Sequence, residues 1–146
     1  RGFLCQTGIS GDPEVGRAWK ARGPIRDDPQ WLDLSAAAPM KRGYLSFAGS
    51  GPNSRGLEFF FAYRDLGLGR SPWEVPFGTL VGAESFQVMD HWYTGYGDVP
   101  AFGGRAPEQR RMHDVGAGYL KGNFPEMDYI TGCSLETSDA AAGAGR

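Results

Sequence analysis

Short apolar runs separated by turn residues are the main pattern of this chain. The runs at 44–48 and 58–63 are rich in aromatic residues and bounded by glycine, which is typical of β-strands. The run at 77–81 has the same character, and residues 128–135 alternate apolar and polar side chains, so we expect strands there too. A shorter apolar run at residues 3–5 precedes a glycine-containing turn.

One segment has helical rather than alternating spacing. Phe86 and Met89 recur at the interval of a helical face, which predicts a helix over residues 83–92. Residues 13–40 show little periodicity, and we expect a long ordered loop there, with a function or packing of its own. Residues 137–146 are rich in alanine and glycine and are predicted to be a flexible tail.

These elements predict a single mainly β domain over residues 1–136. An open sheet would expose its edges, so a closed β barrel with one capping helix is the expected fold. The composition agrees, because the 23 glycines and 10 prolines are scattered between the apolar runs, as in proteins with many short strands and tight turns. Hydrophobic residues make up 40% of the chain, which is enough apolar material to exclude a disordered body.

Charge and the sparse cysteines and histidines exclude further classes of function. The formal net charge is -2 without a basic run, so we expect no nucleic acid partner. No apolar stretch has the roughly 18 residues that a membrane span needs. Cys5 and Cys133 fit two buried thiols better than a disulfide framework, with a single bridge as the alternative. His91 and His113 have no partner at metal-ligand spacing, so we expect no metal or other cofactor.

Three segments carry motifs that occur together, in this order, in one enzyme family. Residues 2–6 read Gly-Phe-Leu-Cys-Gln, residues 46–54 read Ser-Phe-Ala-Gly-Ser-Gly-Pro-Asn-Ser and lead into Glu-Phe-Phe-Phe at 58–61, and residues 76–81 read Pro-Phe-Gly-Thr-Leu-Val. They resemble the Gly-Phe-x-x-Gln, Ser-x-Ala-x-x-Gly-Pro-Asn…Gln-Phe-Phe and Phe-Gly-x-Val segments of the cyclophilin-type peptidyl-prolyl isomerases. The resemblance covers residues 1–136, and the part after residue 96 is similar to a bacterial and algal branch.

The resemblance implies an eight-stranded barrel capped by two helices. The first strands and the first helix of such a barrel would lie before Arg1, and so would the arginine that the family uses in catalysis. It follows that an upstream segment or a protein partner would complete the barrel. Since the similar branch occurs in bacteria and in algal organelles, the resemblance also points to an organelle such as a plastid.

The chemistry of this family needs neither a nucleophile nor a metal. The peptide bond before proline rotates over a barrier of about 20 kcal/mol, because rotation breaks amide resonance. A catalyst holds the proline ring in an apolar pocket and gives the twisted amide a hydrogen-bond donor. By the resemblance, the catalytic residues of this chain are Gln6 and Phe60. The substrate-binding residues that it implies are Phe3, Leu4, Ala48, Gly49, Glu58 and Leu68.

The sequence departs from the family pattern where it would touch the substrate. Glu58 replaces a glutamine, and an ionised carboxylate accepts hydrogen bonds but cannot donate one to a substrate carbonyl. The alternative for Glu58 is a surface charge at the end of a strand. Glu74 lies near the position of a family histidine, for which Trp73 could substitute in part, and Gly67 lies near that of a tryptophan. These changes predict a weakened pocket.

Two functions remain open at this point. The first is a weakly active isomerase that binds proline-containing polypeptides and assists protein folding, as Phe3, Gln6 and Phe60 suggest. The second is a non-catalytic structural or interaction subunit of a larger assembly, which Glu58 favours. Three tryptophans outside the expected strands also favour a partner surface: Trp19, Trp31 and Trp92.

Overall fold

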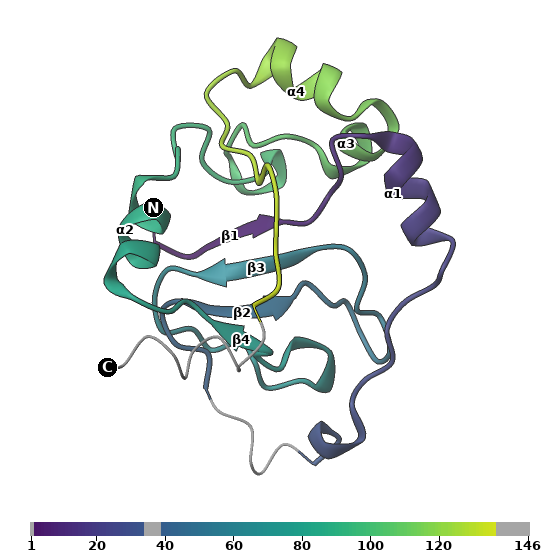
Figure 1. Ribbon diagram of the computed structural model, residues 1–146, viewed down its shortest axis with the longest axis vertical. Coiled ribbons are helices and arrows are strands. Elements are labelled where there is room, and N and C mark those ends of the chain that lie inside the picture. Colours follow the sequence, from purple (N-terminus) through teal and green to yellow (C-terminus); the bar gives the residue numbers. More distant parts are fainter. Residues whose placement is uncertain (1, 34–38, 137–146) are drawn as a thin grey trace.

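A four-stranded antiparallel sheet lies at the centre of the molecule (Figure 1). The structure is a computed structural model that describes residues 2–33 and 39–136; the tail predicted at 137–146 lies outside these residues. The strands occur in the spatial order β1-β3-β2-β4. Their bounds are Leu4–Thr7 for β1, Tyr44–Phe47 for β2, Phe59–Ala62 for β3 and Gly78–Thr79 for β4.

In the residues that the structure describes, four α-helices and three short 3-10 turns flank the sheet. The helices are α1 (Pro13–Lys20), α2 (Ala83–His91), α3 (Gln109–Val115) and α4 (Ala117–Asn123), and the turns are η1 (Pro29–Trp31), η3 (Pro72–Glu74) and η4 (Pro100–Phe102). Helix α3 contacts both α1 and α4, and these three helices lie apart from α2, which is at the other end of the strands from α1 (Figure 1). Over the described ranges, no helix has the length and apolar character of a membrane span.

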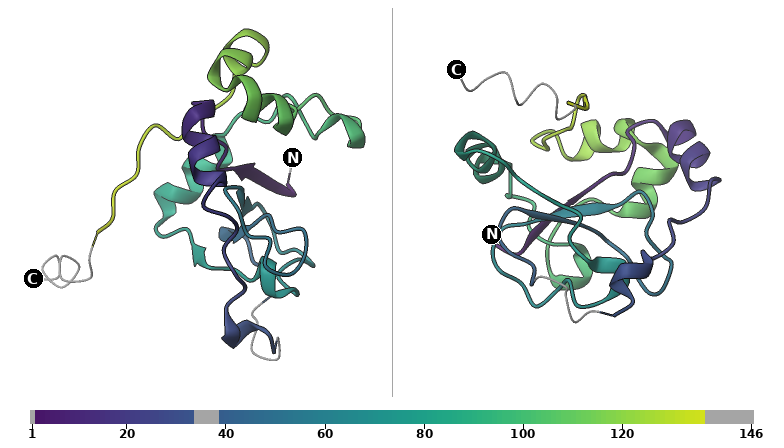
Figure 2. Two further views of the ribbon diagram at one scale, coloured as in Figure 1. Left: turned by 90° about the vertical axis from the view of Figure 1, so that its right-hand side faces the viewer. Right: turned by 60° about the horizontal axis from the view of Figure 1, so that its bottom comes forward.

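The expectation of a mainly β closed barrel is wrong. The structure has 31% helix and 14% strand, and its sheet is open, with β1 and β4 as edges. The expected strand at 77–81 is reduced to the two residues of β4. Residues 128–135, expected as the closing strand, are exposed and form no ladder; Figure 2 shows this segment leaving the body of the domain. No strand therefore joins β4 back to β1 in the described part of the chain.

Several local predictions are confirmed, and one loop is replaced by a helix. The strands predicted at 44–48 and 58–63 are β2 and β3, and the helix predicted at 83–92 is α2. The segment expected as a long loop begins with α1 instead. Its start is set by a local cap, because the Asp12 carboxylate accepts a hydrogen bond from the Glu14 amide at 2.8 Å and Pro13 takes the first helical position.

The strand register puts the main apolar cluster on one face of the sheet. Gln6 and Ser46 stand on either side of Phe60, so these three side chains share a face. Phe60 is 3% exposed and belongs to a buried cluster with Met40 and Ala62, and this side of the sheet is called the Phe60 face below. The side chains packed around the cluster are Leu4, Tyr44, Ala48, Leu66 and Leu68.

The opposite face of the sheet carries a row of aromatic rings. The rings of Phe47 and Phe77 lie 4.8 Å apart between centroids, and Phe61 meets Trp92 at the end of α2 at 5.0 Å. Phe59 joins the two pairs through contacts with both Phe61 and Phe77. The two faces follow directly from the alternation of side chains along β3.

A buried ion network fixes the loop before η1 to the turn that precedes β3. Arg55 Nη1 donates to the Asp28 carboxylate at 2.8 Å, and the Ile25 amide donates to the Arg55 carbonyl at 2.7 Å. Asp27 and Asn53 exchange two hydrogen bonds, each from the backbone amide of one to the side chain of the other. Arg55 also forms an ion pair with Asp27. The side chains of these two residues are only 9% and 3% exposed, so their ion pair is part of the interior.

Candidate functional site

Several of the residues implied by the resemblance meet on the Phe60 face. Gln6 is exposed and stands directly opposite Phe60 in the β1–β3 pairing, which places their side chains side by side. Leu4, Ala48 and Leu68 pack against the cluster that contains Phe60. The sheet thus brings together residues from three distant segments, with a polar side chain at the edge of an apolar patch.

The Phe60 side chain is buried by other residues of the chain. Met40 is fully buried in the same cluster, and its carbonyl accepts a hydrogen bond from the Leu66 amide at 2.9 Å, which holds the two segments together. A proline ring could touch Phe60 only after side chains of this cluster, such as that of Met40, move. Methionine has three rotatable bonds and adapts to such changes more easily than a branched side chain.

Two of the implied residues do not present the groups expected of them. Phe3 precedes β1, is 50% exposed and lies outside the cluster around Phe60, although its carbonyl extends the strand pairing by accepting from the Tyr63 amide. The Ala48 amide donates to the Glu58 carbonyl at 3.0 Å. This amide is therefore engaged inside the fold rather than offered to a peptide.

Gly49 is covered by the ring of Trp73. A Cβ atom built on Gly49 would lie 2.8 Å from the Cβ and Cδ1 atoms of Trp73 and from its carbonyl oxygen, closer than atoms can approach. Trp73 is fixed in η3, where the neighbouring Glu74 carbonyl accepts a hydrogen bond from the Ser46 hydroxyl at 2.6 Å. The glycine in place of the family's asparagine is thus required by the tryptophan that packs on it.

Glu58 has a partner that the sequence did not reveal. Its Oε1 atom lies 2.9 Å from Nε2 of His113 in α3, and the two side chains are 21% and 16% exposed. The histidine has no motif around it and is distant in the chain, so only the packing of α3 identifies it. The structure thus adds a partner for this carboxylate, while the two alternatives for Glu58, a surface charge at the end of a strand and a carboxylate facing a substrate, stay predictions.

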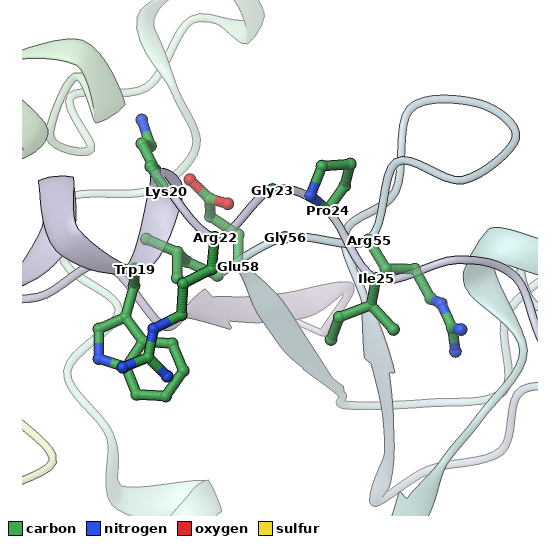
Figure 3. A pocket seen from close by; sticks show the side chains of 10 residues that line it. Trp19, Lys20, Arg22, Gly23, Pro24, Ile25, Arg55, Gly56 and Glu58 are labelled. Atoms are coloured by element: carbon green, nitrogen blue, oxygen red, sulfur yellow. The ribbon is translucent and has the colours of Figure 1, made fainter.

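Glu58 also lines a surface pocket of about 480 Å³ (Figure 3). The pocket lies where the end of α1 and the following loop meet the segment that leads into β3. Its lining residues are Trp19, Lys20, Arg22, Gly23, Pro24, Ile25, Arg55, Gly56, Leu57 and Glu58. Figure 3 shows the guanidinium of Arg22 over the ring of Trp19, and its distance from the ring centroid is 3.9 Å. The Arg55 side chain points away from this pair in the same view, and its Nη1 atom binds Asp28.

The two cysteines are free thiols in different environments. Burial raises the pKa of the Cys5 thiol, and the negative charge of Asp128 raises it further, so the reactive thiolate is disfavoured. Cys133 is exposed, so the expectation of two buried thiols is wrong for this residue. Within residues 2–33 and 39–136, no three histidine, cysteine or acidic side chains lie close enough to hold a metal ion.

Glu74 gives the site region a testable dependence on pH. Burial raises the pKa of the Glu74 carboxyl. A carboxyl whose pKa is higher in the folded than in the unfolded state favours folding at low pH, and this contribution is lost as the pH rises through the pKa of the folded state. We therefore expect Glu74→Gln to increase the free energy of unfolding at neutral pH relative to wild type. The gain should shrink toward about pH 4, where the carboxyl becomes protonated. Urea denaturation of both proteins across this range tests this, and a gain that grows on acidification would contradict it.

Comparisons of the chain with protein-family models, with curated proteins and with solved structures found no match. The functional argument therefore rests on the residues and geometry of the chain itself.

Proposed function

We propose that this chain binds proline-containing polypeptide segments and isomerises the peptide bond before proline slowly. The observation that supports this most is the pairing of an exposed Gln6 with Phe60 inside an apolar cluster that includes Leu4 and Leu68. A proline ring is apolar and needs such a patch. A glutamine amide beside it can both donate to and accept from the flanking peptide groups.

The expected slowness has two structural causes. Phe60 is 3% exposed beneath its own cluster, so part of the binding energy must be spent on moving Met40. Two arginines near the sheet have their guanidinium groups engaged, so they are not free donors for the twisted amide. Arg42 binds Asp90 through two contacts of 2.8 Å, and Arg55 is held by Asp28.

A non-catalytic interaction domain is the second candidate, and one observation favours it. The contact between Glu58 and His113, together with the buried position of Met40, occupies groups that a substrate would otherwise meet. In this case the Phe60 face would contribute to the stability of the domain, and proline-containing segments would bind without faster isomerisation.

An NMR titration with a proline-containing tetrapeptide distinguishes the two functions. We expect peptide addition to shift the backbone amide signals of Gln6 and Leu68, and we expect exchange between the cis and trans forms of the peptide to become faster than in buffer alone. The variant Gln6→Ala removes one hydrogen bond at an exposed position and should weaken binding by about two- to tenfold, without loss of stability. Gln87→Ala, at an exposed glutamine of α2, is the matched control.

Each outcome of the titration has a definite meaning. Shifts at the Phe60 face with no faster exchange would support the non-catalytic domain. If the peptide caused no shifts on this face, or if Gln6→Ala and Gln87→Ala behaved alike, the proposed peptide site would be wrong.

A further inference from the structure

The pocket beside Glu58 has a composition suited to one kind of chemical group. One wall is the stacked pair of Trp19 and Arg22, and the opposite side carries the apolar surfaces of Pro24 and Ile25 (Figure 3). Gly56 forms part of the lining, and a Cβ atom built on it would lie 3.5 Å from the Glu58 carboxylate. A flat aromatic face next to a planar guanidinium can hold a short apolar stem that ends in a polar group.

The charges of the pocket favour an anionic group. In the described ranges neither Lys20 nor Arg22 forms an ion pair with a carboxylate, whereas the carboxylate of Glu58 is bound to His113. Of the three cations in the lining, Arg55 is bound to Asp28, so within the described residues the pocket offers two unpaired cations and a single carboxylate, which is bound to His113. A guanidinium such as that of Arg22 can bind a carboxylate through two parallel hydrogen bonds.

The pocket lies close to the proposed proline site, because both include residues of the segment at the start of β3. Glu58 precedes Phe60 by two residues, and a strand rises about 3.3 Å per residue, so the two positions are roughly 7 Å apart along the chain. An extended peptide has about the same rise per residue. A peptide residue two positions from a proline on the Phe60 face can thus reach the pocket.

We propose that this pocket binds an acidic side chain of the polypeptide, two residues away from the proline. The inference rests on the proposed function, because the Phe60 face is assumed to hold the proline. It deepens that function by assigning a preference for acidic segments to Lys20, Arg22 and the ring of Trp19. The residues that would give this preference lie at the end of α1 and just after it, and the sequence motifs did not predict this helix.

Matched peptides test the preference. One carries glutamate two residues before proline, a second carries glutamate two residues after proline, and a third has glutamine at both positions. We expect one of the glutamate peptides to bind about two- to fivefold more tightly than the glutamine peptide at low salt, because an exposed ion pair contributes a modest gain. The difference should disappear at about 0.5 M NaCl, where screening is strong.

Variants of the chain show whether the pocket is responsible. Lys20→Gln combined with Arg22→Gln should abolish the preference, so that the glutamate and glutamine peptides bind with the same affinity. Arg17→Gln removes an exposed cation of α1 that does not line the pocket, and it should retain the preference. Equal binding of all three peptides, or loss of the preference in Arg17→Gln alone, would overturn the assignment.

A proline-free acidic peptide separates this inference from the proposed function. At millimolar concentration, a capped Ala-Glu-Ala peptide should shift the indole N–H signal of Trp19, and the variant with both cations removed should not respond. If the proline peptides fail to bind while this shift occurs, the proposed function is wrong and the acidic pocket stands. If the indole signal of Trp19 does not move in wild type, the acidic pocket is overturned.

Discussion

Replacing Phe60 with alanine is expected to lower the free energy of unfolding by about 3–5 kcal/mol. The ring is 3% exposed and lies in the cluster with Met40 and Ala62, which are themselves fully buried. Its removal leaves a cavity between the sheet and the segments that carry Met40 and Leu66, and those segments are tied together by a backbone hydrogen bond that limits their collapse. The measurement is urea denaturation followed by circular dichroism.

Phe77 provides the matched control for this prediction. It is 52% exposed and packs against Phe47 at the rim of the aromatic face. Phe77→Ala should therefore cost clearly less than Phe60→Ala, because about half of the Phe77 residue is already exposed to water. Equal losses in the two variants would show that the cluster around Phe60 is not the main core of the domain.

Replacing Arg55 with methionine is expected to cost a similar amount, about 3–5 kcal/mol. The Arg55 side chain is 9% exposed, and it neutralises the buried carboxylate of Asp27 as well as the partly exposed carboxylate of Asp28. Methionine fills much of the same volume but leaves a negative charge in the interior without a counter-ion. The loss comes mainly from this stranded charge and less from the ion pair itself.

A double variant isolates the stranded charge. Asp27→Asn keeps an oxygen that can accept the hydrogen bond from the Asn53 amide and removes the charge that Arg55 neutralises. We expect Arg55→Met with Asp27→Asn to be more stable than Arg55→Met alone. If the double variant is less stable than the single variant, the charge of Asp27 is not the source of the loss, and the explanation given for this network is wrong.

The local elements were predictable where the chain carries a complete local signal. The aromatic runs of β2 and β3 are bounded by glycine, and the spacing of Phe86 and Met89 marks α2. The start of α1 also has a local signal in Asp12 followed by Pro13, and Val15, Ala18 and Trp19 recur at helical spacing; the prediction of a loop missed both signals. The prediction of a closed barrel was wrong because a barrel requires its first and last strands to pair. Such pairing between distant segments is not encoded in any local sequence pattern.

The candidate site was predictable in part for the same reason. Once β1 and β3 are known to be strands, their alternation explains why Gln6 and Phe60 share a face. The burial of Phe60 by Met40 and the binding of Glu58 by His113 depend on how distant segments pack. No spacing in the sequence relates these residues, so their contacts could be found only in three dimensions.

The order of strands in the sheet has a consequence for how the molecule folds. The β2–β3 ladder joins segments that are near one another in the chain, as in the pairing of Phe47 with Phe59, whereas β1 pairs with β3 across the whole intervening stretch from Thr7. Closing the longer loop costs more chain entropy, so β1 should join an already formed hairpin in a late step. The face that holds Gln6 would then be assembled last, and a chain arrested before this step would have its main core partly formed but no pairing of Gln6 with Phe60.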